Sequence, residues 1–288
     1  MQVIGLVVNV DKPGGEETAA QMLEWLQARG LTVYITRKGL SRGEFGSLTW
    51  CEGAQQPKLD CVIVLGGDGT LLQTARELAD SGIPVLGVNF GQLGFLTEIE
   101  IGEITPALEK LLAGEYYIDE RMMLEAVLYR NGQPVERSIA LNDVVIAKGA
   151  FARLISLDMF IDDEPVGVYP ADGVIIATPT GSTAYSLSAG GPIVPPSLGV
   201  ILVTPVCPHS LTSRPMVISP DSRVRVRVSS QVGQVMLTLD GQHGFELQYD
   251  DEIVIRRYTK GAKIIKLQGR SFFRVLGAKL KTGDRCYV

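Results

Sequence analysis

The sequence predicts a Rossmann-like α/β domain over residues 1–115, an all-β sandwich over residues 116–270, and a C-terminal helix over residues 271–288. In the first 114 residues, short apolar β-branched runs alternate with helical stretches, which is typical of a parallel sheet covered by helices. After Glu115, short strands separated by turn residues indicate an antiparallel β domain. A helical pattern returns at Ser271-Phe272-Phe273, and we expect this helix to pack on the first domain.

The elements of the first half follow from where the apolar runs lie. Strands are expected over residues 3–10, 31–36, 61–65 and 84–88, and helices over residues 16–28, 70–79 and 104–113. In the second half, turns between strands are expected at Asn131-Gly132, Asp162-Asp163, Asp221-Ser222, Asp240-Gly241 and Asp250-Asp251. Arginine and valine alternate over residues 222–230, which predicts buried valines and a solvated arginine face rather than an anion site.

Composition narrows the class of partner. The net charge of -5 argues against binding nucleic acid or an anionic membrane surface, because both favour an excess of Lys and Arg. No apolar run approaches the roughly 20 residues of a membrane helix, so we expect a cytoplasmic protein without a membrane partner. Four scattered cysteines without a CxxC pair, and two histidines, disfavour both a disulfide framework and a zinc site. A small-molecule partner is expected.

The first motif is Gly66-Gly67-Asp68-Gly69-Thr70, which lies between an apolar strand and a helix. Glycines let the backbone approach a phosphate closely, and the amides of the first helical turn favour negative charge, so Gly66, Gly67, Gly69 and Thr70 are predicted to bind phosphate. A carboxylate at Asp68 would repel such a ligand, which indicates a separate task such as binding a metal, orienting a hydroxyl or accepting a proton. The alternative is that Asp68 only caps the helix.

The second motif runs from Asp172 to Pro192 and is dense in small hydroxyl residues around glycines. Its hydroxyl groups offer many compact donors and acceptors, which suits a polyhydroxylated ligand such as ribose. A flexible Gly/Ser linker is the alternative reading. Flanking apolar residues and Tyr185 argue against it.

These motifs together resemble a known family. The sequence GGDGT resembles the nucleotide loop of NAD kinases, of diacylglycerol and sphingosine kinases and, more distantly, of phosphofructokinases. The block TPTGSTAYSLSAGGP and the pair Asn142-Asp143 resemble NAD kinases specifically. The likeness extends over NFGQLGFLTE (89–98), CPHSLTSRPMVI (207–218) and the turn Asp240-Gly241-Gln242.

The resemblance implies an NAD kinase, with Asp68 as general base toward the 2′-hydroxyl of the adenosine ribose. It also implies a set of NAD-binding residues, namely Gly69, Asn142, Asp143, Arg153, Asp172, Thr183, Ala184, Tyr185, Ser188 and Gln242. The chain departs from the family at Gln73, where many members carry a basic residue. This departure concerns how the donor phosphates are held.

The same resemblance implies ATP as phosphoryl donor, Mg²⁺ or another divalent cation, and a homodimer or homotetramer. Other nucleoside triphosphates or polyphosphate as donors, and NADH as acceptor, stay open, and the sequence identifies no metal ligands. Two alternatives remain. A lipid kinase would share the GGDGT loop but lacks the long hydroxyl-rich block, and a catalytically silent dinucleotide sensor would have no need of Asp68.

Overall fold

The computed structural model describes residues 1–38, 58–91, 94–149, 154–210, 212–230, 234–267 and 271–283. The chain forms two compact units, residues 1–120 with 262–288 and residues 121–261. No helix in the described ranges is long and apolar enough to cross a membrane.

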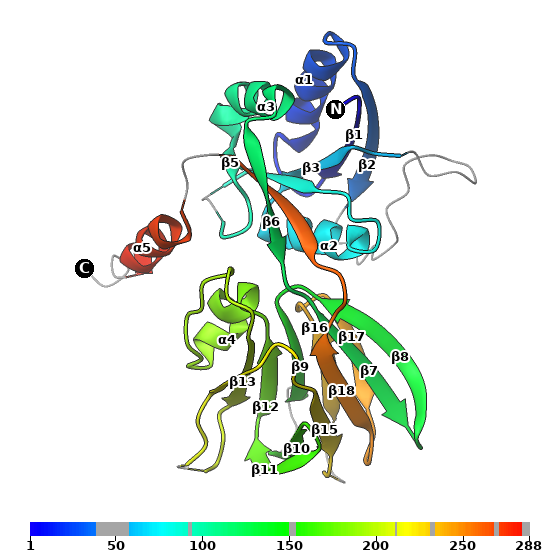
Figure 1. Ribbon diagram of the computed structural model, residues 1–288, viewed down its shortest axis with the longest axis vertical. Coiled ribbons are helices and arrows are strands. Elements are labelled where there is room, and N and C mark those ends of the chain that lie inside the picture. Colours follow the sequence, from blue (N-terminus) through cyan, green and yellow to red (C-terminus); the bar gives the residue numbers. More distant parts are fainter. Residues whose placement is uncertain are drawn as a thin grey trace. The chain divides into compact units, whose positions relative to one another are not determined.

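The first unit is built on a seven-stranded sheet (Figure 1). In spatial order its strands are β2 (Thr32–Lys38), β1 (Val3–Asn9), β3 (Cys61–Gly66), β4 (Val85–Asn89), β19 (Ala262–Leu267) and β6 (Tyr116–Arg121), with β5 (Ile99–Glu100) paired to β4. Strands β2, β1, β3, β4 and β19 are parallel to their neighbours along that order. From β1 the chain adds β2 on one side in the sheet, and from β3 it adds β4 on the opposite side, so the strand order reverses between β1 and β3. Between β1 and β3 lies the switch point where open α/β sheets bind ligands.

Helices cover both faces of this sheet. These helices are α1 (Gly15–Gln27), α2 (Asp68–Leu78) and α3 (Ile104–Ala113), with a 3₁₀ turn, η2 (Ile101–Glu103), before α3. A further helix, α5 (Phe272–Gly283), follows β19 in the chain. Side chains of α1 and α3, such as Met22 and Leu108, pack with Leu6 and Ile63 in one core. Alternate residues of the strands face the opposite side of the sheet, which α2 covers. A Cβ added to Gly87 of β4 would lie 2.3 Å from Leu71 of α2.

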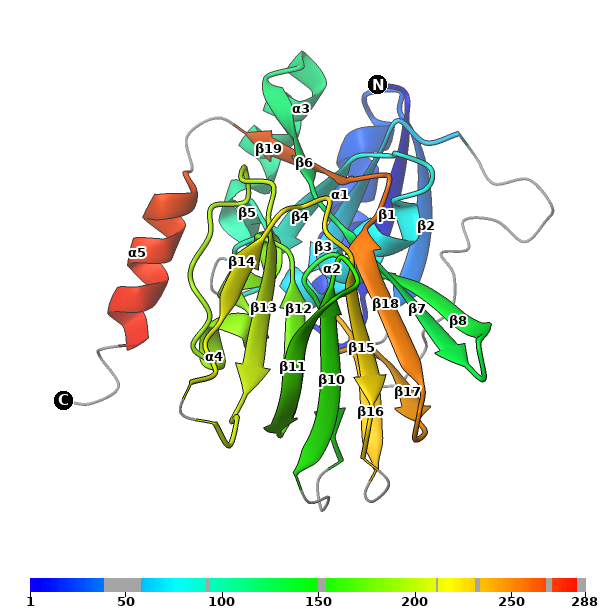
Figure 2. The same ribbon diagram turned by 60° about the horizontal axis from the view of Figure 1, so that its bottom comes forward.

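The second unit is a sandwich of two six-stranded antiparallel sheets (Figure 2). One sheet has the order β11 (Glu164–Ala171), β10 (Ile155–Ile161), β15 (Val224–Val228), β18 (Glu252–Arg257), β7 (Leu124–Arg130) and β8 (Gln133–Ala140). The other has the order β14 (Met216–Ile218), β13 (Ile201–Val206), β12 (Gly173–Ala177), β9 (Asp143–Lys148), β16 (Val235–Leu239) and β17 (His243–Leu247). Residues of both sheets share one buried core, among them Leu128 and Val226 from the first and Ile146 and Ile176 from the second.

The predicted fold class is confirmed, and the predicted turns show why the hairpins form. Asn131 and Gly132 have φ of 53° and 73°, and Asp240 and Gly241 have φ of 53° and 65°, the left-handed conformation that two-residue hairpin turns require. On β15 the three valines are fully buried, as expected. The arginines of that segment pair with carboxylates, Arg225 with Glu252 and Arg227 with Asp250.

The division into units differs from the predicted boundaries at residues 115 and 270. Strands β6 and β19, expected in the β-sandwich, pair instead within the sheet of the first unit. Ile264 and Ile265 of β19 are fully buried, and Ile265 belongs to the first unit's core. The final helix lies with the first unit, where the ring of Phe272 contacts that of Phe95 at a centroid distance of 6.1 Å.

Candidate active site

The glycine turn begins at the carboxyl end of β3, beside the switch point. Gly67 is extended, with φ −120° and ψ −172°, and α2 begins at Asp68. The Thr70 hydroxyl is buried and accepts a hydrogen bond from the Asn9 side chain at 2.9 Å. A Cβ on Gly66 would lie 2.6 Å from that hydroxyl oxygen. Gly66 and Thr70 therefore hold the turn against the sheet, whereas Gly67 is half-buried and Gly69 is exposed.

The carboxylate of Asp68 is held by the loop that precedes β5. Its Oδ2 accepts a hydrogen bond from the Phe95 N–H at 2.7 Å. Its Oδ1 accepts three, from the Leu96 N–H at 3.3 Å and from the N–H and hydroxyl of Thr97 at 3.0 and 2.9 Å. Among the described residues, Oδ2 thus accepts a single hydrogen bond and keeps room for a ligand hydroxyl. The backbone donors fix the carboxylate in one orientation.

Gly94 completes this contact, and it was not among the predicted site residues. A Cβ at this position would lie 1.8 Å from Oδ1 of Asp68, so only glycine lets the loop approach so closely. The sequence contained a signal, because Gly94 lies in the NFGQLGFLTE segment that carries the family resemblance. The sequence alone assigns this segment no role, since nothing local connects Gly94 to a residue 26 positions earlier.

In the second unit, Asn142 and Asp143 lie at the start of β9, beside a buried aspartate that was also missed. Asp240 accepts hydrogen bonds from the backbone N–H groups of Leu141 at 3.1 Å, Asn142 at 2.7 Å and Asp143 at 3.2 Å. Gln242 follows on the same turn, so it lies at this end of the sheet. The structure therefore brings Asn142, Asp143 and Gln242 to one end of this sheet.

The hydroxyl-rich block joins the same end of the sheet. It forms a 3₁₀ turn, η3 (Thr180–Thr183), and a short helix, α4 (Tyr185–Ser188). The N–H of Thr178 donates to the Asn142 carbonyl at 2.8 Å. A Cβ on Gly181 would lie 2.1 Å from that carbonyl oxygen, so glycine is required there. Thr183 and Ala184 are half-buried, while Tyr185 and Ser188 are exposed.

The interpretation of this block as a surface of ribose-binding hydroxyls needs correction. Ser182 bonds the backbone of Val194 through both its donor and its acceptor, each at 3.0 Å. Ser186 bonds Thr204 at 3.0 Å, and Thr178 donates to the Leu141 carbonyl at 2.6 Å. These hydroxyls are buried and stabilise the turn, because buried polar groups need partners. Tyr185 and Ser188 are the exposed polar side chains of η3 and α4.

Among the described residues, the predicted site residue Asp172 does not join this cluster. Asp172 forms an ion pair with Lys148 at 2.8 Å. In the antiparallel register Gly173 lies opposite Ala147 and Ala177 opposite Asp143, so Asp172 lies at the other end of β9 from Asp143, about 17 Å along the strand. Arg153 lies outside the described residues.

Asp143 has an unusual titration. Burial, and then the nearby charge of Asp240, raises its pKa to about 7 from an ordinary value of 3.8. Because the folded state binds this proton more tightly than the unfolded chain, its contribution to stability is complete below about pH 4 and is lost as pH rises through about 7. The full effect amounts to at most about 4 kcal/mol.

We therefore expect the stability of the wild-type protein to fall between pH 5 and pH 8, and that of Asp143→Asn to fall much less. An amide keeps the shape of the carboxyl group but does not titrate. Melting temperatures of both proteins across this range measure the difference. Equal slopes with pH for the two proteins would show that Asp143 does not titrate in this way.

Gln73 is another anomaly of the first unit. Its side chain is 1% exposed, and neither its amide nitrogen nor its amide oxygen has a hydrogen-bond partner among the described residues. Unsatisfied buried polar groups cost free energy. We expect Gln73→Met, of similar length, to raise the free energy of unfolding by about 1–3 kcal/mol.

Thr74→Val is the matched control for this prediction. Thr74 is equally buried in α2, but its hydroxyl already donates to the Thr70 carbonyl at 2.9 Å, so its removal gains nothing. Chemical denaturation of both variants supplies the comparison. A Gln73→Met protein less stable than wild type would mean that an ordered water or ligand satisfies the amide.

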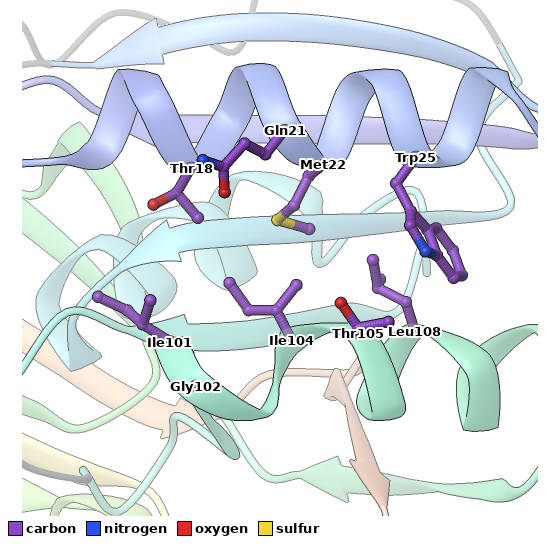
Figure 3. Close-up of a pocket in the computed structure, with 9 residues that line it drawn as sticks. All are labelled: Thr18, Gln21, Met22, Trp25, Ile101, Gly102, Ile104, Thr105 and Leu108. Carbon is purple, nitrogen blue, oxygen red and sulfur yellow. The ribbon is translucent and has the colours of Figure 1, made fainter.

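A groove lies elsewhere in the first unit, between α1 and the η2–α3 segment (Figure 3). Its volume is about 220 Å³, and Met22, Trp25, Ile104 and Leu108 form most of its apolar wall. None of its lining residues is titratable, and none is a predicted site residue. The groove therefore offers no side chain that could accept or donate a proton near neutral pH.

A resident metal ion would need several side-chain ligands gathered in one place. Within the described ranges, no three His, Cys, Asp or Glu side chains gather into a group that could hold an ion. The Asp68 carboxylate, the one acidic group of the glycine turn, already accepts four hydrogen bonds. This donor set does not fit a resident metal ion.

The chain is similar to known proteins over nearly its whole length. Family models of the ATP-NAD kinase N-terminal and C-terminal domains match residues 4–116 and 141–267. The chain is 48% identical to an NAD kinase of Desulforamulus reducens, with 98% of each chain covered. It is 46% identical to an NAD kinase of Moorella thermoacetica, with 98% of this chain and 90% of the relative covered.

Solved structures are similar as well. A yeast NADH kinase complexed with NADH superposes with a TM-score of 0.81 at 27% identity, covering 98% of this chain and 88% of that one. An NAD kinase from Archaeoglobus fulgidus in complex with ATP has a TM-score of 0.75 at 23% identity, covering 98% and 99%, which speaks for the fold alone. The two family matches and the identities of 46% and 48% over nearly full length show that the chain belongs to the ATP-NAD kinase family and is an NAD kinase.

Proposed function

We propose that the chain transfers the γ-phosphoryl group of ATP to the 2′-hydroxyl of the adenosine ribose of NAD, with Asp68 as general base. The observation that carries this proposal is the placement of Asp68. Asp68 is the first residue of the helix that follows the glycine turn, and four hydrogen bonds orient its carboxylate. Of the two oxygens, Oδ2 accepts fewer of these bonds. A helix cap alone would not need this arrangement, and the N-cap position of α2 is occupied by Gly67 and not by Asp68.

The reaction follows from this geometry. The 2′-oxygen attacks the γ-phosphorus, the bond from that phosphorus to the ADP oxygen breaks, and ADP leaves. A carboxylate is too weak a base to deprotonate an alcohol beforehand, so the proton passes to Oδ2 as the new oxygen–phosphorus bond forms. Oδ2 then releases this proton to solvent. Asp68 contributes orientation and a proton acceptor, and no covalent intermediate is required.

The donor phosphates are proposed to contact the backbone of Gly67 and Gly69, where the amides of the first turn of α2 favour negative charge. The buried hydroxyl of Thr70 supports the turn from below. Mg²⁺, or another divalent cation, enters as part of the MgATP substrate, because the phosphates themselves supply its oxygen ligands. Polyphosphate offers the same chemistry and remains an alternative donor.

The dinucleotide is proposed to contact the end of the sandwich where β9 begins. Asn142 would read an adenine edge with its amide, Asp143 would bond a ribose hydroxyl, and Tyr185, 45% exposed, would place its ring against a base. Thr183, Ala184, Ser188 and Gln242 complete this proposed set in the second unit, and Gly69 of the first unit stays a proposed NAD contact on the family resemblance. Asp172 and Arg153 are kept as NAD-binding residues on the family resemblance alone.

Three further points rest on relatives and on the sequence. A similar yeast structure is an NADH kinase complexed with NADH, so NADH is a second proposed acceptor here. A homodimer or homotetramer and a cytoplasmic location stay predictions from the sequence.

The test is formation of NADP from NAD and MgATP by the purified protein, repeated with polyphosphate, with NADH, and with EDTA present. We expect turnover with MgATP and loss of turnover with EDTA. A protein that binds NAD but forms no product with any donor would be a silent dinucleotide sensor instead.

A further inference from the structure

A buried ion pair lies directly behind the loop that holds Asp68. Lys266 of β19 and Glu98, which precedes β5, meet at 2.8 Å, with side chains 10% and 5% exposed. The Lys266 ammonium also donates to the Leu96 carbonyl oxygen at 3.3 Å. Both contacts lie within the first unit, and they join residues 168 and 170 positions apart.

Stability alone does not account for this pair. Moving two charges out of water is costly, and replacing a buried ion pair with apolar side chains of similar volume is often neutral or stabilising. An apolar pair, however, could not donate a hydrogen bond to the Leu96 carbonyl. The feature that distinguishes Lys266 from an apolar residue is therefore its hold on that oxygen.

The bond is informative because the Leu96 carbonyl belongs to the same peptide group as the Thr97 N–H. A trans peptide is planar, and its C=O and N–H point in opposite directions. The Thr97 N–H donates to Oδ1 of Asp68 at 3.0 Å, while the carbonyl on the other side of the plane accepts from Lys266. Fixing the carbonyl oxygen fixes the direction of the N–H. A cation at the carbonyl oxygen also polarises the peptide group, which strengthens the hydrogen bond from the N–H to Oδ1 of Asp68.

We propose that Lys266, seated by Glu98, is a positioning residue for Asp68 that acts through the peptide between Leu96 and Thr97. This inference rests on the proposed function, because it concerns the carboxylate named there as the base. Lys266 does not touch the reacting atoms. Its role is to keep the Thr97 N–H directed at Oδ1, so that Oδ2 is presented to the ribose hydroxyl.

The central variant is the double substitution Lys266→Met with Glu98→Leu, which removes both charges together and leaves neither one unpaired. We expect kcat to fall about 10-fold or more, because small errors in catalytic geometry are costly. KM for NAD should stay within about twofold, since no proposed NAD contact is altered. Lys266→Arg, which keeps a cation able to reach both oxygens, should restore most of the rate.

A double-mutant cycle with Asp68→Asn separates positioning from general damage. If Lys266 acts through Asp68, the charge-removing change should lower the residual rate of Asp68→Asn by less than about twofold. An equal fall in both backgrounds would overturn the inference. An unchanged kcat of the charge-removing variant in the wild-type background would also overturn the inference. If Asp68→Asn is inactive at the same time, the proposed role of Asp68 as base is left intact. Wild-type turnover by Asp68→Asn would instead overturn the proposed base.

Hydrogen exchange gives a readout that does not depend on activity. In the charge-removing variant, the amide of Thr97 should exchange at least about 10-fold faster than in wild type, while amides of β3 keep their protection. Unchanged protection at Thr97 in a folded variant would overturn the inference. If that variant does not fold, the same two measurements on Lys266→Gln, which keeps a weaker neutral donor, replace it, with intermediate effects expected.

Discussion

Asp68→Asn is expected to lower kcat by roughly 10²–10⁴-fold while leaving NAD binding within about threefold of wild type. The amide is nearly isosteric, and its oxygen can still accept hydrogen bonds from the loop at residues 95–97. It cannot accept the proton of the 2′-hydroxyl. Steady-state rates of NADP formation, with calorimetric titration of NAD, measure both quantities.

The control for this prediction is the dissociation constant itself. A variant that loses turnover and NAD binding together would indicate that Asp68 is a binding or structural residue. A variant with wild-type turnover would refute the general base. Helix capping alone predicts lower stability with an unchanged rate, because the N-terminal cap of a helix contributes about 1 kcal/mol.

Gly94→Ala is expected to lower kcat by about 10²-fold or more, because the added methyl group would occupy the position of the Asp68 carboxylate. The new Cβ would lie 1.8 Å from Oδ1 and 2.3 Å from Oδ2, so either the loop or the side chain must move. Overpacking of this kind also costs about 1–3 kcal/mol of stability. The rate and the melting temperature are both measured.

Gly91→Ala is the matched control from the same part of the chain. Among the described residues, no atom beyond the chain neighbours lies within 4 Å of a Cβ added there, so the rate and stability of this variant should match wild type. A Gly94→Ala protein as active as Gly91→Ala would contradict the placement of the Asp68 carboxylate against this loop. A stable but inactive Gly94→Ala protein would show that the orientation of Asp68 matters beyond folding.

The sequence predicted well whatever depends on neighbours along the chain. The parallel strands with their helices, the hairpin turns at Asn131-Gly132 and Asp240-Gly241, and the buried valines of β15 each follow from local periodicity or from a backbone conformation. The helix after Ser271 was found for the same reason.

Contacts between residues far apart in the sequence could not be predicted from local patterns. Strands β6 and β19 carry no pattern that assigns them to one sheet over another, because strand periodicity reports burial and not the neighbour. The loop that holds Asp68, the Asp240 carboxylate beneath Asn142, and the pairing of Lys266 with Glu98 each join residues far apart in sequence. Family resemblance marked some of these segments without supplying their contacts.

The hydroxyl-rich block is the instructive case between these extremes. Its sequence correctly argued against a flexible linker, since the block forms η3 and α4, but composition cannot tell which hydroxyls face inward. Ser182 and Ser186 are fully buried and hydrogen-bonded within the fold, whereas Ser188 is exposed. Only the backbone path of η3 and α4 separates the two groups.

The most direct test of the central claim is the position of the phosphate in the product. Wild-type protein and Asp68→Asn would be incubated with NAD and MgATP, and the product would be assigned by phosphorus NMR and by reduction with an NADP-specific dehydrogenase. We predict a 2′-phosphorylated dinucleotide from the wild type and, in the same time, almost none from Asp68→Asn. A phosphate on another hydroxyl, or equal product from both proteins, would contradict the account.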